Sequence, residues 1–162
     1  FSYNKMASNT TINVNTLSAH NLNAGTTNFK KNVVAINSLA TSLNLSQSGS
    51  IVTLSADGLG SGAVITLPKL TSGCNFTIFN KEDTPSQTMT IRTSEGTDVI
   101  HMVQRDAHAT DLSNSTIGTP VRDIIVGTST KAGDVIQINC DGSFWYARVL
   151  SSVDNAITTA TA

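Results

Sequence analysis

The chain has 162 residues, of which 39% are hydrophobic and only 13% are charged, and its formal net charge is −1 at pH 7. This length predicts one domain with room for an additional segment. The near-neutral charge, without any basic run, argues against binding to nucleic acid. No apolar stretch approaches the roughly 20 residues that cross a membrane as a helix, so we expect no membrane span.

Threonine, serine and asparagine take the place of the missing charges and make up roughly a third of the chain, far above ordinary usage. A surface rich in these residues is hydrated by hydroxyl and amide groups. Threonine also suits β-strands, because its branched Cβ packs well on a pleated surface. The composition therefore favours an all-β protein.

Residues 1–45 differ from the rest because their apolar side chains are too sparse to close a core. Residues 9–17 alternate apolar and polar side chains, and residues 31–39 carry a second apolar group. We predict an extended N-terminal arm whose strands add to the main domain or to another copy of the chain; the alternative is an unstructured tail. The arm residues expected to contact a partner are Ile12, Val14, Leu17, Val33, Val34 and Ile36.

Residues 46–157 are predicted to form the main domain, and residues 158–162 a polar tail. Strand signals recur there at a spacing typical of a sandwich or barrel, so we predict a small antiparallel β-sandwich or barrel, jelly-roll-like. The expected strands are 50–54, 62–68, 71–80, 87–92, 98–103, 121–126 and a ribbon over 133–150. Residues 62–68 and 71–80 are expected to pair as a second ribbon, joined by a turn at Pro68.

The ribbon over 133–150 contains the strongest hairpin signal, Asp141-Gly142, because a tight turn of this kind needs a positive φ. Beyond the turn, the period of two places Trp145 and Tyr146 on opposite faces. We expect Trp145, the only tryptophan, to be half-buried in the core. Tyr146 and Arg148 point outward together, which fits a contact with a partner better than a sugar-stacking strip.

A long polar loop is predicted over 104–119, and loops of this length are usually functional. His101, Asp106, His108 and Asp111 are the densest cluster of possible metal ligands, but no third ligand has a fixed spacing. Nothing beside them marks a nucleophile or an oxyanion pocket. We therefore predict no metal, cofactor or catalytic residue, and interpret His108 and Asp111 as partner contacts. A polysaccharide hydrolase or lyase is disfavoured because acidic pairs near aromatic residues are scarce.

The two cysteines, Cys74 and Cys140, lie at strand ends in the two predicted ribbons. One disulfide is therefore conceivable. Two small buried thiols in a reducing cytoplasm are the favoured interpretation.

Four segments follow one another in a fixed order: Ser50-Ile-Val-Thr-Leu54, Val64-Ile-Thr-Leu-Pro68, Asn75-Phe-Thr-Ile-Phe-Asn80 and Gly133-Asp-Val-Ile-Gln-Ile-Asn-Cys-Asp-Gly-Ser-Phe-Trp145. Together they resemble β-rich accessory proteins of tailed-phage and large DNA-virus particles, namely capsid decoration (cement) proteins, head fibres and tail-fibre modules. The resemblance covers residues 42–157.

This resemblance implies a non-enzymatic structural protein on the capsid surface of a virion, made in the host cytoplasm and assembled as a homotrimer. Its expected partner is the major capsid protein or another virion protein, docked by the N-terminal arm. The alternative is a receptor- or glycan-binding tip of a viral fibre, with a host-surface glycan as ligand. Symmetric assembly also agrees with the low charge, because exposed strand edges need pairing or covering.

Overall fold

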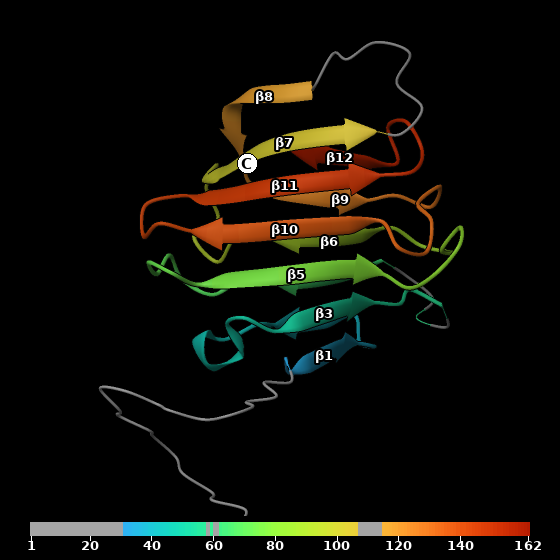
Figure 1. The fold of residues 1–162 in the computed structure, drawn as a ribbon, viewed down its shortest axis with the longest axis horizontal. Coiled ribbons are helices and arrows are strands. Elements are labelled where there is room, and N and C mark those ends of the chain that lie inside the picture. Colours follow the sequence, from blue (N-terminus) through green and yellow to red (C-terminus); the bar gives the residue numbers. More distant parts are fainter. Residues whose placement is uncertain (1–30, 58, 60–61, 107–114) are drawn as a thin grey trace, which may run out of the picture. The chain divides into compact units, whose positions relative to one another are not determined.

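The computed structural model describes residues 31–57, 59, 62–106 and 115–162, which form an all-β fold of two mixed sheets (Figure 1). The only helical element among these residues is a short 3-10 helix, η1 (Leu45–Gln47). Five residues predicted to contact a partner lie outside the described residues: Ile12, Val14, Leu17, His108 and Asp111.

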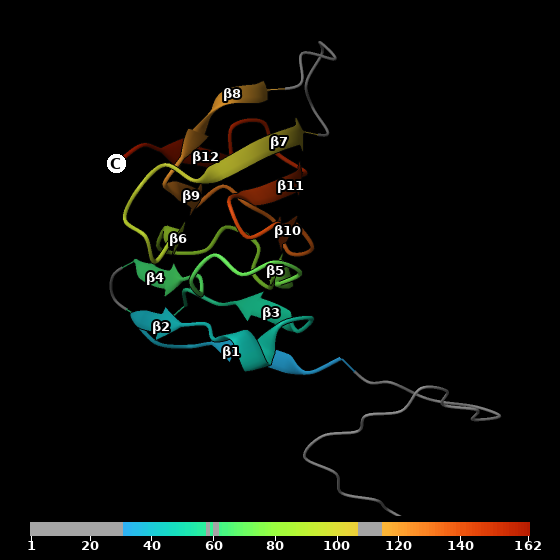
Figure 2. The same ribbon diagram turned by 90° about the vertical axis from the view of Figure 1, so that its left-hand side faces the viewer.

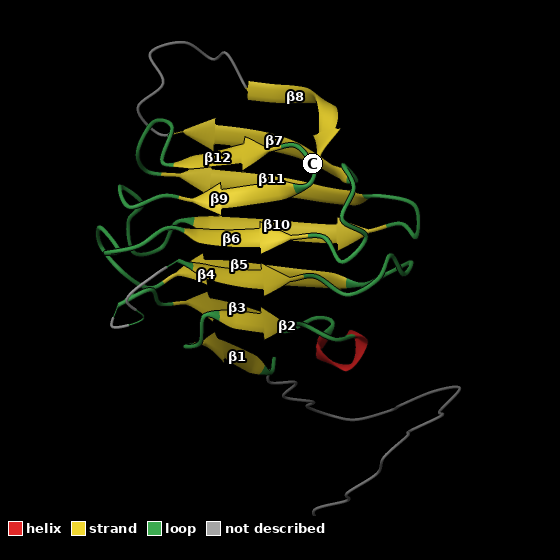
Figure 3. Ribbon diagram, turned by 180° about the vertical axis from the view of Figure 1, so that it is seen from behind, coloured by secondary structure: helices red, strands yellow, loops and turns green. Residues whose placement is uncertain are grey.

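The two sheets lie as separate layers, seen edge-on in Figure 2 and from the side of the smaller sheet in Figure 3. Sheet A contains, in spatial order, β1 (Val33–Ile36), β3 (Ile51–Leu54), β5 (Asn75–Asn80), β10 (Val135–Cys140), β11 (Trp145–Ser151), β7 (Ile100–Asp106) and β8 (Ser115–Val121). Sheet B contains β12 (Ile157–Ala160), β9 (Asp123–Val126), β6 (Met89–Arg92), β4 (Ala63–Thr66) and β2 (Ala40–Ser42).

The first six strands wind as coils, because the chain alternates between the two sheets and each strand pairs in parallel with the one before it in the same sheet. In sheet A, β3 pairs in parallel with β1 and β5; in sheet B, β4 does so with β2 and β6. This is the winding of a β-helix. The predicted sandwich of antiparallel strands is therefore wrong for this half of the fold, and a jelly-roll, which is antiparallel, differs from it. Alternation specifies which face of a strand is buried, and parallel and antiparallel pairing satisfy it equally.

The ribbon predicted from 62–68 and 71–80 is also wrong in its pairing, although both strands exist. β4 lies in sheet B and β5 lies in sheet A. Leu67 and Pro68 are buried where the chain crosses between the sheets. The proline therefore marks a crossover and not a hairpin turn.

The strands after β6 are mostly antiparallel. The hairpin of β10 and β11 is confirmed, and Gly142 has the positive φ, 100°, that its turn requires. β10 also pairs antiparallel with β5, which joins the parallel coils to the rest of sheet A. Two strands were missed: β8 begins inside the predicted polar loop, and β12 begins at the end of the predicted main domain, continues into the predicted tail and pairs with β9.

β1 and β2 lie in the segment predicted as an arm whose strands add to the main domain or to another copy of the chain, and both are strands of the two sheets. Ile36 is a core residue, and its strand pairs with the strand that carries Val52 and Leu54. Ile36 is therefore not available as the predicted partner contact. The apolar residues of this region are sparse by themselves, but they complete a core supplied by the next coil.

The core lies between the sheets and includes the inward-facing residues of both. Trp145 is 0% exposed, and its ring centroid lies 6.4 Å from that of Phe76. The expectation of a half-buried tryptophan was therefore wrong. Tyr146 is exposed on the opposite face of β11, as alternation predicted.

Candidate binding surface

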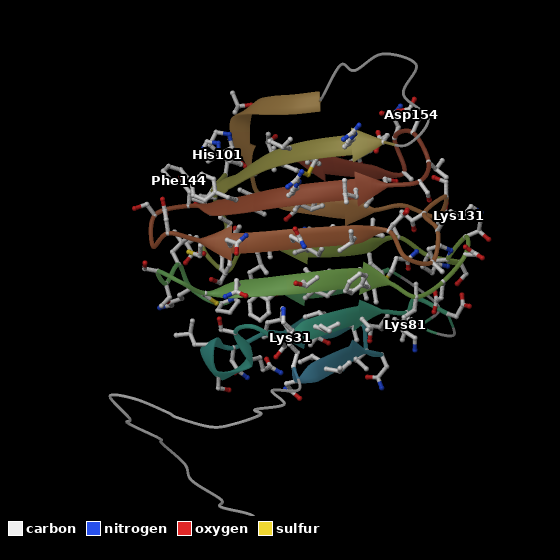
Figure 4. All side chains as sticks on the ribbon, in the orientation of Figure 1. Lys31, Lys81, His101, Lys131, Phe144 and Asp154 are labelled. Atoms are coloured by element: carbon white, nitrogen blue, oxygen red, sulfur yellow. The ribbon has the colours of Figure 1, made fainter. Side chains whose placement is uncertain are left out.

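Three rings meet on the outer face of sheet A and form what we call the aromatic cluster: His101 of β7, Phe144 before β11, and Tyr146 of β11. The His101 and Tyr146 rings are stacked, with centroids 5.6 Å apart and planes at 16°, and the His101 and Phe144 centroids are 4.9 Å apart. Figure 4 shows His101 and Phe144 next to each other at one end of β7 and β11. Tyr146 is 45% exposed, and the His101 and Phe144 rings are partly exposed beside it.

Strand register brings these side chains together. β11 and β7 pair in parallel with Tyr146 opposite His101, while β10 and β11 pair antiparallel with Asn139 opposite Tyr146. Directly opposed residues project from the same face of a sheet, with Cβ atoms about 5 Å apart. The surface therefore carries a row of one amide and two rings.

Asp141, in the β10–β11 turn, holds the Tyr146 ring of this row in position. Its Oδ1 accepts hydrogen bonds from the backbone N–H groups of Ser143 (2.7 Å) and Phe144 (2.8 Å), and its Oδ2 accepts one from the Tyr146 hydroxyl (3.0 Å). The two backbone bonds are the main reason that the pKa of Asp141 is lowered. The bond to Asp141 raises the pKa of Tyr146. The carboxylate thus stays charged and the phenol protonated at neutral pH, so the ring is held in place before any ligand arrives.

The row combines flat apolar ring surfaces with amide hydrogen-bonding groups. Asn139 of β10 is exposed. Asn75, which is opposite it in β5, donates a side-chain hydrogen bond to the Gly73 carbonyl at 3.1 Å. Aromatic rings can stack on an apolar ligand face while amides both donate and accept hydrogen bonds. This arrangement can bind a ligand that is apolar on one side and hydroxyl-rich at its rim.

Beyond this row, the face carries basic, apolar and neutral polar side chains. Arg148 is exposed on the same face of β11 as Tyr146, in an inner strand of sheet A and not at a sheet edge. Val103, in β7, is opposite Arg148 and is 49% exposed. The structure thus presents both predicted contacts, Tyr146 and Arg148, to solvent; that they bind a partner stays a prediction.

A second surface, which we call the open end, is formed by β1, β2 and η1. β1 and β2 are the terminal strands of their sheets, so each has one neighbour among the described strands. Three apolar side chains are exposed there: Val33 (58%), Leu39 (48%) and Leu45 (49%). Of the predicted contacts in β1, Val33 is accessible, whereas Val34 is only partly so.

The candidate metal ligands do not assemble among the described residues. His101 faces outward from β7 in the aromatic cluster, whereas Asp106 lies near the other end of β7 and accepts a hydrogen bond from Gln104 Nε2 at 2.8 Å. Within the described ranges, no group of three histidine, cysteine, aspartate or glutamate side chains could hold a metal ion.

The aromatic cluster could not be read from the sequence as a site. Tyr146 was visible by alternation, and Asp141 by its turn. Their proximity to His101 depends on the parallel pairing of β11 with β7, which no local signal indicates.

Comparisons with known proteins found no match to a protein family model, a curated protein or a solved structure. A separate search of the described residues found no helix with the length and hydropathy needed to span a membrane.

Proposed function

We propose that the chain is a structural virion protein of the cement, decoration or head-fibre type. It would bind the capsid exterior as a homotrimer and act by assembly without catalysis. The resemblance of residues 42–157 to β-rich virion accessory proteins supports this assignment. The N-terminal arm would dock onto the major capsid protein or another virion protein.

The open end is the observation that carries the proposal. Alternate residues of an edge strand direct their backbone N–H and C=O groups away from the sheet, where they template pairing with another chain. The Asn32 carbonyl accepts a hydrogen bond from the Ile51 N–H at 2.8 Å. The backbone N–H and C=O groups of the next residue, Val33, therefore point away from β3. Edge strands are usually protected from such pairing by proline or by charged side chains, especially lysine. β1 (VVAI) and β2 (ATS) contain none of these.

We expect Val33→Lys to lower the fraction of trimer at least about tenfold, because burying an unpaired ammonium in an interface costs several kcal/mol. The measurement is the mass of the full chain by mass photometry over a dilution series. Val103→Lys is the matched control. Val103 is also an exposed valine of sheet A, and it lies on the same cross-strand row as Val33, far from the open end.

A monomeric wild-type chain would refute the homotrimer, and equal loss in both lysine variants would refute the open end as the interface. The virion assignment has its own test. Particles purified from the source virus should contain the chain at a fixed ratio to the major capsid protein by quantitative mass spectrometry. Particles that lack the chain would overturn it.

The aromatic cluster favours a second candidate function, a glycan-binding tip of a viral fibre. The exposed Tyr146 ring would pack against the C–H face of a pyranose, and the exposed Asn139 amide would hydrogen-bond its hydroxyls. The anchored Tyr146 would lose little conformational freedom on binding.

For this candidate, we expect Tyr146→Ala to abolish glycan binding and Tyr146→Phe to retain most of it, because stacking needs the ring and not the hydroxyl. Binding of the full chain would be measured on a glycan array, and by calorimetry for any glycan that binds. No bound glycan, or equal binding by Tyr146→Ala, would exclude the aromatic cluster as a glycan site.

A further inference from the structure

Cys74 and Cys140 face each other across two paired strands. Cys140 is the last residue of β10, Cys74 directly precedes β5, and the register of these antiparallel strands, with Asn139 opposite Asn75, places the cysteines opposite each other. The Cys140 N–H donates to the Cys74 carbonyl at 2.8 Å. In a regular antiparallel ladder, residues opposite each other at such a position have Cα atoms about 5.5 Å apart, within the range of disulfides.

The two side chains also lie on the same side of sheet A. Cys74 is 4% exposed and Cys140 5%, and both belong to the core together with Phe76 and Ile138 of the same strands. The proximity of the two thiols also affects the pKa of Cys74. Burial is the main reason that its pKa is raised, a hydrogen bond with Ser48 opposes the rise, and the neighbouring Cys140 adds to it.

The backbone hydrogen bonds around the pair differ from those of a regular ladder. A regular pair would have a second bond from the Cys74 N–H to the Cys140 carbonyl, but Gly73 supplies that donor (2.9 Å) and the Cys74 N–H donates to Thr71 instead (3.1 Å). Gly73 has φ +82°. The regular ladder thus ends in a local irregularity at Cys74, which lies next to Cys140 at the end of the two strands.

The geometry points to a reversible disulfide between Cys74 and Cys140 that staples β5 to β10. In sheet A this is the junction between the parallel coils and the antiparallel strands. Both cysteines are free thiols in the structure. The pair should remain reduced where glutathione keeps thiols reduced, and close in an oxidising environment.

The closing reaction is a two-electron oxidation by a small disulfide such as oxidised glutathione. Both thiols are buried, so the oxidant reaches them only when the ends of β5 and β10 open locally. One cysteine thiolate then attacks the oxidant, forms a mixed disulfide and releases one glutathione thiolate. The second cysteine thiolate attacks the protein sulfur of that mixed disulfide and expels the second glutathione thiolate. Each glutathione thiolate takes up one proton, so the two cysteine protons balance the two thiols formed.

The test uses the folded full chain in glutathione buffers of increasing oxidised fraction. After acid quenching, free thiols are alkylated in denaturant and the intact mass is measured. We expect two alkyl groups per chain in reducing buffer and none in oxidising buffer. A non-reducing digest should then yield one cross-linked peptide pair containing Cys74 and Cys140. Oxidation should also raise the midpoint of thermal unfolding by several degrees, because the bond closes a long loop.

Cys74→Ala and Cys140→Ala are the controls, and neither should show an oxidation-dependent rise in the unfolding midpoint. The wild-type peptide map decides the question even if a variant folds poorly. Two alkylatable thiols at every glutathione ratio would overturn the proposal. Disulfide-linked dimers or a stable mixed disulfide with glutathione, without the internal cross-link, would also overturn it.

Discussion

Trp145→Ala is expected to lower the free energy of unfolding by about 3–5 kcal/mol, the usual cost of removing a large aromatic side chain from a core. Trp145 is among the largest fully buried side chains of the described residues, and its ring lies near that of Phe76, which is in β5 of the same sheet. The cavity would lie beside residues of both sheets, so it cannot collapse without moving strands. Urea denaturation followed by circular dichroism measures the loss.

Trp145→Phe should cost far less than the size of the deleted ring suggests. The indole Nε1–H is buried and has no hydrogen-bond partner among the described residues. An unpaired buried donor costs about 1–3 kcal/mol, and phenylalanine removes that cost while leaving a smaller cavity. We therefore expect a net loss below about 2 kcal/mol.

Tyr146→Ala is the matched control on the exposed face of the same strand, where we expect a loss of less than about 1 kcal/mol. A Trp145→Ala loss no larger than that of Tyr146→Ala would contradict the buried position of Trp145. The wild-type tryptophan fluorescence gives an independent check, since a buried indole should resist quenching by acrylamide.

Asp123→Asn is expected to be the second most destabilising change, with a loss of about 2–3 kcal/mol at pH 7. The buried Asp123 carboxylate accepts two hydrogen bonds from Arg92 (Nε to Oδ1 and Nη2 to Oδ2, both 2.9 Å) and one from Arg122 Nη2 (2.8 Å). Asparagine would leave the two guanidinium groups close together without a counter-charge. Arg92 remains 40% exposed, so solvent screens part of this effect.

The contribution of Asp123 to stability should depend on pH. Burial raises the pKa of Asp123, but the hydrogen bonds from Arg92 and Arg122 outweigh burial and hold the pKa below its usual range. A carboxyl whose pKa is lower in the folded state stabilises the fold fully above its unfolded pKa of about 4, and loses this contribution as the pH falls through the folded pKa. The difference between wild type and Asp123→Asn should therefore be constant from neutral pH down to about pH 5, and shrink below it.

Asp154→Asn provides the control, because Asp154 is an exposed aspartate in the loop before β12 (Figure 4). Its substitution should change the free energy of unfolding by no more than about 0.5 kcal/mol at any pH tested. Equal effects of the two substitutions, or a loss in Asp123→Asn that is unchanged at low pH, would contradict the role of the buried carboxylate.

Much of the candidate surface follows from local pattern. The period of two placed Trp145 and Tyr146 on opposite faces of their strand, and Asp141-Gly142 located the hairpin turn, because both signals act within one strand or one turn. The full burial of Trp145 was not predicted. The sequence did not show that His101 stacks on Tyr146. That contact is between strands that are distant in the sequence, and register across such a pair depends on packing that no local residue specifies.

The sequence by itself determined that the chain is all-β, which strands have a buried face, and where the tightest turn lies, because alternation and turn chemistry are local properties. Only the tertiary structure decided how the strands are ordered. In the structure, β4 and β5 lie in different sheets, and the first six strands form parallel coils. β1, β2 and β12, from segments predicted as an arm and a tail, are strands of the two sheets. The physical reason is that isolated apolar residues such as Ile36 stabilise the fold only when a neighbouring coil covers them. Whether such a residue is buried therefore depends on strands that are distant in the sequence.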